Sequence, residues 1–124
     1  MNDPDNDIIF SVAASLPVNS TQVLSVAGSR TVLPCYTTLD TPVQWAFHNV
    51  SSTRLWDDIY VSGDIINGFI GRFTVNTSKP HWYDLTIANT SHDNAGLYVC
   101  IEDDGLGQSH YIKLNVKGLC VMVV

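Results

Sequence analysis

Apolar and polar residues alternate along this chain in short runs, without a sustained helical spacing. In residues 83–88, for example, Leu85 and Ile87 fall on one side of an extended strand, and Asp84 and Thr86 fall on the other. Strands with one apolar and one polar face are typical of antiparallel sheets that cover a core on one side. The pattern therefore predicts an all-β protein.

Turn-forming residues such as Ala27-Gly28-Ser29 and Ser62-Gly63-Asp64 separate these runs at the spacing of a β-sandwich. The first strand is expected to be split into two pieces. The predicted strands, in chain order, are Ile8–Ala14, Thr21–Val26, Arg30–Thr37, Val43–His48, Leu55–Val61, Ile65–Ile70, Arg72–Val75, Tyr83–Ala88, Gly96–Glu102 and His110–Lys117.

Size and charge restrict what the chain can be. Its 124 residues, 45% of them hydrophobic, are enough for one domain with a real core. The net charge of −6 argues against nucleic acid and against anionic membrane surfaces, which attract clustered Lys and Arg. No apolar run reaches the roughly 18 residues of a membrane-spanning helix.

Several motifs resemble one family. Cys35, Trp45 and the run Leu97-Tyr98-Val99-Cys100 are similar, in order and spacing, to the core of immunoglobulin domains. Residues 71–75 and 83–87 are similar to strands D and E of the variable (V) type. The distance between the cysteines leaves room for the two additional strands of that type.

This resemblance implies a two-sheet antiparallel Greek-key sandwich of the immunoglobulin V type. It also implies a disulfide between Cys35 and Cys100, with Trp45, Leu85 and Tyr98 in the core and the Tyr98 hydroxyl turned back to the backbone. The V-type domain is expected over residues 19–117. Residues 1–18 are expected to form an N-terminal extension with the first strand, and residues 118–124 a tail or the start of a missing segment.

The chain departs from the family pattern in two places. Asn94 stands where the family usually has an aspartate that pairs with the arginine of strand D, so Arg72 can either reach Asp93 or hydrogen-bond Asn94. The family's glycine bulge in the last strand is missing. Asp104-Gly105 instead predicts a tight two-residue turn between strands F and G.

The sequence predicts binding and not catalysis. The histidines at positions 48, 81, 92 and 110 lack a nucleophile in a recognisable motif, and no zinc-ligand spacing is present. The acidic turn Glu102-Asp103-Asp104, with Asp57-Asp58 and Asp64 nearby, could hold calcium, although a solvated acidic rim is favoured. We therefore expect no enzyme activity, no cofactor and no metal.

Four N-x-S/T sequences point to the secretory route, although they can also be unused acceptors. They place candidate glycosylation sites at Asn19, Asn49, Asn76 and Asn89, and they predict an extracellular domain, cell-surface or secreted. Cys120 lies beyond the sandwich and can pair between chains, link to a missing segment or remain a free thiol.

Outward residues of strands C, F and G predict a surface for a protein partner. A solvated sheet face is usually polar, whereas this one mixes in aliphatic and aromatic residues. In V-type domains the same face commonly contacts a second V domain, so a homodimer is possible. The expected contact residues are Gln44, Ala46, His48, Val99, Ile101, Tyr111 and Lys113. Trp56 and Tyr60 are further candidates, but the sequence does not decide which side of the sheet they face.

Three functions therefore remain open. The first is a recognition or adhesion domain of an immune-type receptor that binds a protein or itself. The second is a secreted innate-immune domain that binds microbial polysaccharide through its loops. The third is a structural spacer without a specific partner.

Overall fold

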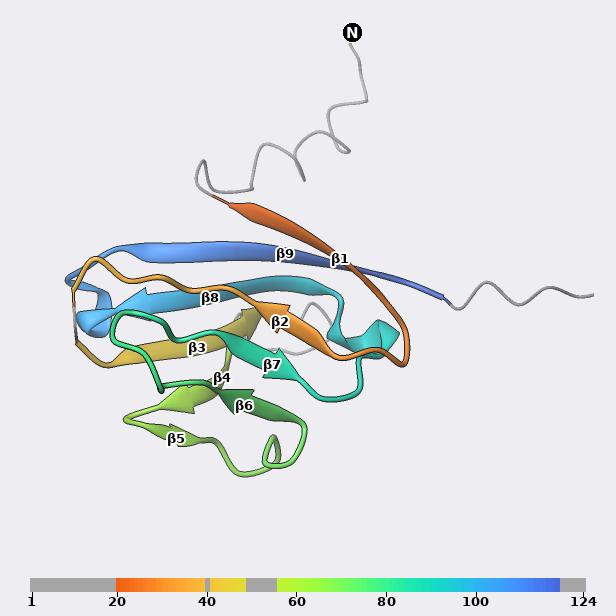
Figure 1. Cartoon of the computed structure of the whole chain (residues 1–124), viewed down its shortest axis with the longest axis horizontal. Helices are drawn as coiled ribbons and strands as arrows, with labels where there is room; N and C mark the ends of the chain where they lie inside the picture. Colours follow the sequence, from red (N-terminus) through yellow and green to blue (C-terminus); the bar gives the residue numbers. More distant parts are fainter. Residues whose placement is uncertain (1–19, 40, 49–55, 119–124) are drawn as a thin grey trace, which may run out of the picture.

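The computed structural model describes residues 20–39, 41–48 and 56–118. They form two sheets that face each other (Figure 1). The elements are β1 (Thr21–Val26), β2 (Thr31–Leu33), β3 (Val43–His48), β4 (Asp57–Val61), β5 (Asp64–Ile65), β6 (Phe73–Val75), β7 (Leu85–Ile87), the 3₁₀ turn η1 (His92–Asn94), β8 (Gly96–Glu102), the 3₁₀ turn η2 (Asp103–Gly105) and β9 (Ser109–Lys117).

The larger sheet has the strand order β1-β9-β8-β3-β4-β5, and the smaller has the order β2-β7-β6. All neighbouring strands are antiparallel except β1 and β9, which run parallel. The all-β, two-sheet prediction is confirmed. Strands β4 and β5 extend the larger sheet beyond β3, as the two additional strands of V-type domains do.

Several predicted strands are shorter than expected; the one at residues 83–88, for example, is regular only over Leu85–Ile87. The strand at residues 30–37 is regular only over Thr31–Leu33, because Pro34 has no N–H and the N–H of Cys35 donates to the Asp84 carboxylate (2.9 Å). The strand at residues 65–70 shrinks to Asp64–Ile65, and the chain then turns through Gly68 at a φ of 101°. The predicted strand at residues 8–14 lies outside the described residues.

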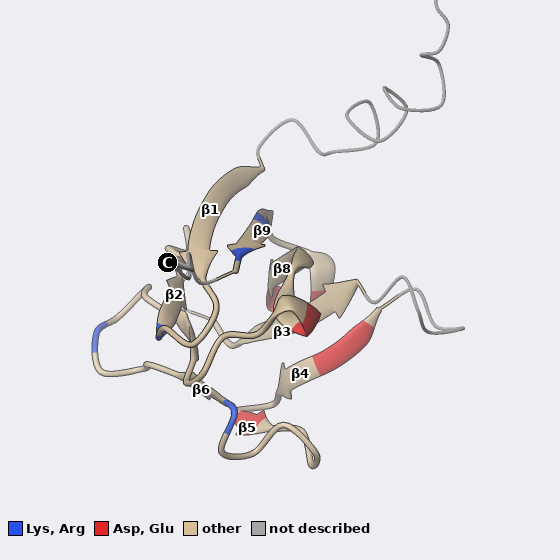
Figure 2. Ribbon diagram, turned by 90° about the vertical axis from the view of Figure 1, so that its right-hand side faces the viewer, with Lys and Arg blue, Asp and Glu red and all other residues tan. Residues whose placement is uncertain are grey.

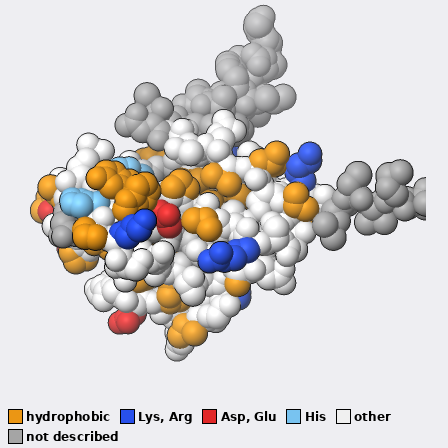
Figure 3. Space-filling model, viewed as in Figure 1, with side chains coloured by type: hydrophobic (Ala, Val, Ile, Leu, Met, Phe, Trp, Pro, Cys, Tyr) orange, Lys and Arg blue, Asp and Glu red, His pale blue; other side chains and the backbone are white. Residues whose placement is uncertain are grey.

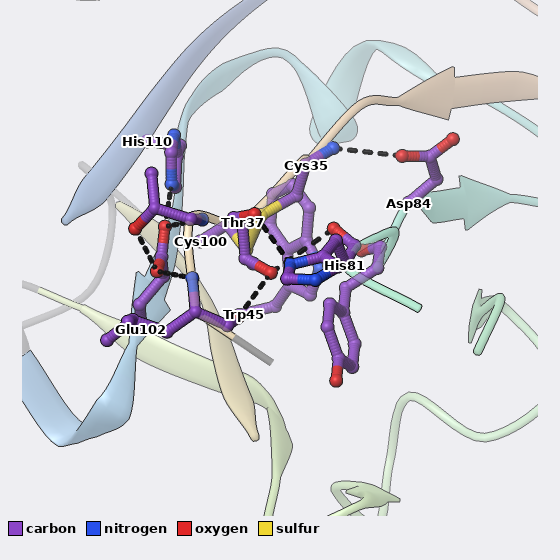
Figure 4. Close-up of a disulfide and its surroundings, with 11 residues drawn as sticks. Cys35, Thr37, Trp45, His81, Asp84, Cys100, Glu102 and His110 are labelled. Carbon is purple, nitrogen blue, oxygen red and sulfur yellow. Dashed lines mark hydrogen bonds and ion pairs between the residues drawn. A yellow bond between two sulfur atoms is a disulfide. The ribbon is translucent and has the colours of Figure 1, made fainter. Parts of the chain in front are cut away.

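The core lies between the sheets. Cys35 and Cys100 form the disulfide implied by the resemblance, and Trp45, Leu85 and Tyr98 are fully buried. The Trp45 indole N–H donates to the Tyr83 carbonyl across the sandwich (2.8 Å; Figure 4). Burial of these large apolar side chains is the main favourable term in folding.

The corner before β8 is closed by hydrogen bonds. The buried Tyr98 hydroxyl donates to the Asn94 carbonyl at 2.6 Å, and the Asn94 side chain accepts from the Ser91 backbone at 2.8 Å. Neither pairing considered for Arg72 is formed with Asp93 or Asn94. The guanidinium lies instead over two phenyl rings, 5.3 Å from the centroid of Phe69.

The connection between β8 and β9 differs from the predicted two-residue turn. It spans residues 103–108, and Asp103 and Asp104 both have left-handed backbone angles. The N–H of Asp103 donates to the carbonyl of Pro42 (3.3 Å), so the loop is tied to the start of β3. The prediction of a tight turn is wrong because this contact with a residue distant in the sequence holds the loop in a longer conformation.

Candidate functional site

The structure brings the predicted contact residues together on one face of the larger sheet. Residues that pair directly across neighbouring strands point to the same side. Gln44 pairs with Ile101, and Val99 pairs with both Ala46 and Tyr111. His48 and Lys113 both pair with Leu97, so they lie in the next row. We call these seven residues, on β3, β8 and β9, the C–F–G face: Gln44, Ala46, His48, Val99, Ile101, Tyr111 and Lys113.

Two residues of the C–F–G face are less accessible than expected. Ala46 is 2% exposed and Val99 is 3% exposed, whereas the other five members are half-buried. Both occupy central strands, where Asp58 and Tyr111 flank them in the same row. Both point outward from the sheet, as the alternation predicts, but their longer neighbours shield them. They form the floor of the face, and contact depends on the residues around them.

Asp58, in β4, and Trp56, just before β4, extend the C–F–G face. The Gln44 side-chain amide donates to the Asp58 carboxylate at 2.6 Å, a contact that the sequence did not indicate. Trp56 packs against His48, with ring centroids 5.5 Å apart. Tyr60, in contrast, is only 7% exposed and adds little free surface.

A buried polar network beside the disulfide joins the loop before β3 to strands β8 and β9 (Figure 4). Glu102 is fully buried, and its carboxylate accepts from the backbone N–H groups of Thr38 (3.1 Å) and Leu39 (3.2 Å) and from the Thr38 hydroxyl (3.0 Å). His110 Nε2 also lies 2.5 Å from this carboxylate. Burial alone raises the pKa of Glu102, but the hydrogen bonds outweigh it and hold the pKa below its ordinary value.

This network also bears on the calcium site considered from the sequence. Glu102 turns inward, away from the exposed Asp104, because its oxygens are engaged by Thr38, Leu39 and His110. Across residues 20–39, 41–48 and 56–118, no group of three or more His, Cys, Asp or Glu side chains could hold a metal ion. Of the three residues of the acidic turn, Glu102 is therefore buried, Asp103 is half-buried and Asp104 is exposed.

The four histidines differ in their surroundings. His110 binds the Glu102 carboxylate, and His81 Nδ1 lies 3.0 Å from the Thr37 carbonyl. His48 packs on Trp56, and His92 is exposed.

Two of the four candidate glycosylation sites can be placed. Asn76 follows β6 and Asn89 follows β7, and both side chains are exposed. Both therefore adjoin the smaller sheet, not the C–F–G face. Asn19, Asn49 and Cys120 lie outside the described residues. Within the described part of the chain, no helix has the length and apolar character needed to cross a membrane.

Comparison with known proteins yields a likeness in structure only. No protein-family model and no curated protein sequence matches the chain. The crystal structure of the ZIG-8–RIG-5 IG1–IG1 heterodimer contains a similar chain, with a TM-score of 0.63, 19% identity, and coverage of 81% of this chain and 84% of that one. The first immunoglobulin domain of the mouse polymeric immunoglobulin receptor is similar with a TM-score of 0.65, 22% identity, and coverage of 83% and 95%. At these identities the likeness establishes the fold alone.

Proposed function

We propose that this immunoglobulin-fold domain of the V type is an extracellular recognition or adhesion domain of an immune-type receptor. It binds a protein partner, or a second copy of itself, through the C–F–G face, and it acts by binding and not by catalysis. The observation that carries the proposal is the composition and layout of that face.

The C–F–G face has the layout of a protein interface. Its floor is the apolar pair Ala46 and Val99, and the half-buried Ile101 and Tyr111 lie beside it. Polar groups of Gln44, His48 and Lys113 surround this centre. An apolar centre with a hydrogen-bonding rim is typical of protein–protein contacts, and tyrosine is enriched in them.

Two further observations support a protein partner. The placed glycosylation candidates, Asn76 and Asn89, adjoin the other sheet, so glycans there would leave the C–F–G face open. One of the similar solved structures is a heterodimer of IG1 domains. A two-fold contact between copies of this chain would place the same face on both sides.

Replacement of Ile101 with Asp tests the proposal. A carboxylate in a desolvated contact without a partner is costly, so we expect self-association or partner binding to weaken by roughly tenfold or more. Multi-angle light scattering at high concentration measures self-association, and circular dichroism checks the fold. Val99 is unsuitable for this test, because a charge at a 3% exposed position would also endanger folding.

The matched control is Ile70→Asp. Ile70 is 67% exposed and lies between β5 and β6, so the same chemical change is made away from the face. It should leave association unchanged. A wild-type protein that stays monomeric at high concentration would refute the homodimer, and partner binding that survives Ile101→Asp would refute the face.

A second candidate function, polysaccharide binding through the loops, has one observation in its favour. Tyr36 and Trp82 are 54% and 40% exposed, and their ring centroids are 4.6 Å apart. Hydrophobic side chains gather at that end of the smaller sheet (Figure 3, left). Flat aromatic faces of this kind can pack on sugar rings. A glycan array probed with wild type and Trp82→Ala separates this function from protein binding.

A further inference from the structure

A cavity of about 620 Å³ lies at the loop end of the sandwich, and among the described residues Gln44 is the one wall residue that it shares with the C–F–G face. It forms where the start of β3, the turn between β4 and β5, and the loop between β8 and β9 come together. This volume is within the usual range of ligand sites. The apolar part of its wall consists of Pro42, Val43, Tyr60, Val61 and Tyr83.

The polar side chains of the cavity wall include a carboxylate, an amide and hydroxyls, all of which can accept hydrogen bonds. The Gln44 amide nitrogen donates to Asp58, which leaves the amide oxygen as the free end of that side chain. Asp104, exposed at the tip of the loop, supplies a carboxylate. The buried hydroxyl oxygen of Thr41 has no hydrogen-bond partner among the described residues.

The surroundings of the cavity favour positive charge. None of the described residues in its wall is a Lys or an Arg, and the whole chain carries a net charge of −6. Acidic segments lie on the neighbouring strands β4 and β5 (Figure 2). Burial raises the pKa of Tyr60, and Tyr83 and Asp64 raise it further.

We propose that this cavity accepts the side chain of an arginine from a protein partner. The planar guanidinium can stack on a tyrosine ring while its five N–H donors meet the carboxylate, amide and hydroxyl oxygens of the wall. Its aliphatic stem packs against Val43 and Val61. The cavity adjoins the C–F–G face at Gln44, but no other member of that face lines it, so the two proposals can be tested separately.

The first experiment titrates the ¹⁵N-labelled domain with N-acetyl-arginine amide and follows backbone amide shifts by NMR. We expect saturable shifts at Gly63, Thr77 and Asp104, which border the cavity. The citrulline analogue keeps the shape but lacks the charge, and the lysine analogue keeps the charge but lacks the planar group. Both should bind more weakly. Equal shifts with the citrulline analogue, or shifts spread over the whole surface, would overturn the proposal.

The second experiment repeats the titration with Asp104→Asn. Asn tolerates the left-handed backbone at this position (φ 52°), so the loop should keep its shape. Loss of an exposed charge pair should weaken binding by about two- to fivefold. The matched control is Asp93→Asn in η1, at the opposite end of β8, which makes the same change in net charge. Equal weakening by both variants would mean non-specific attraction and would refute the site.

The two proposals fail separately. Asp104→Asn should leave the association that depends on Ile101 unchanged, and Ile101→Asp should leave the arginine shifts in place. If Ile101→Asp also abolished the shifts at Gly63 and Thr77, the cavity would not be an independent site and this inference would be wrong.

Discussion

Glu102 shows how a single buried charge can organise a loop. Its carboxylate is fully buried and satisfied by N–H and hydroxyl donors of Thr38 and Leu39 and by His110. Removal of one partner from such a network is costly, because the remaining donors stay buried and unpaired. The network therefore holds the loop before β3 against the β8–β9 hairpin.

The variant Glu102→Gln should lose about 3 kcal/mol of stability at neutral pH. The neutral amide accepts these hydrogen bonds less well, and its NH₂ group turns toward existing donors. Urea denaturation followed by tryptophan fluorescence measures the change. A variant as stable as wild type would show that the network contributes nothing.

The same carboxylate predicts an acid dependence. Its pKa in the folded protein lies below the ordinary value of 4.5, so its stabilisation is fully present above that pH. The stabilisation is lost as the pH falls through the folded-state pKa. Wild type should therefore lose part of its stability to acid below about pH 4.5, and Glu102→Gln should lack that part. Asp93→Asn, an exposed control, should keep it.

At the scale of elements, Gly96 at the start of β8 packs directly against Phe47 of β3. This glycine has a φ of +145°, and a Cβ built on it would lie 2.9 Å from Cε1 of Phe47. The Phe47 ring cannot easily move aside, because it packs on Tyr98 with centroids 4.7 Å apart. The start of β8 therefore depends on a residue without a side chain.

Gly96→Ala should destabilise the domain by about 1–3 kcal/mol, through steric overlap and backbone strain. Thermal denaturation measures the loss. Gly28→Ala is a useful control, because its φ is also positive (+92°) but a Cβ there meets nothing within 4 Å. If both variants lose the same stability, strain alone explains the effect and the contact with Phe47 does not.

For the whole molecule, the disulfide is the covalent link between the two sheets. It joins residues 65 positions apart, a closure worth about 4 kcal/mol in the chain-entropy model. The double variant Cys35→Ala/Cys100→Ala should therefore lose about 2–5 kcal/mol in urea denaturation. Peptide mapping without reduction should recover the Cys35–Cys100 peptide pair. A bridge from Cys120 to either cysteine would contradict this assignment.

The sequence by itself determined the fold and the facing of its strands. Alternation has a period of two, so it decides which residues share a side once a strand is recognised. Trp45 and Tyr98 point inward as that pattern and the resemblance implied, and Gln44, Ile101 and Tyr111 lie together on the opposite face. These features depend on residues near one another in the chain.

Only the tertiary structure decided how accessible those residues are and what the loops do. Ala46 and Val99 are shielded because longer side chains stand beside them on neighbouring strands, which alternation along one strand does not report. In the sequence, Glu102 belongs to an acidic turn, but in the structure its carboxylate binds Thr38, which lies 64 positions away. The cavity at the loop end likewise draws its wall from five separate segments. Such contacts depend on how the two sheets pack, because packing brings distant loops together.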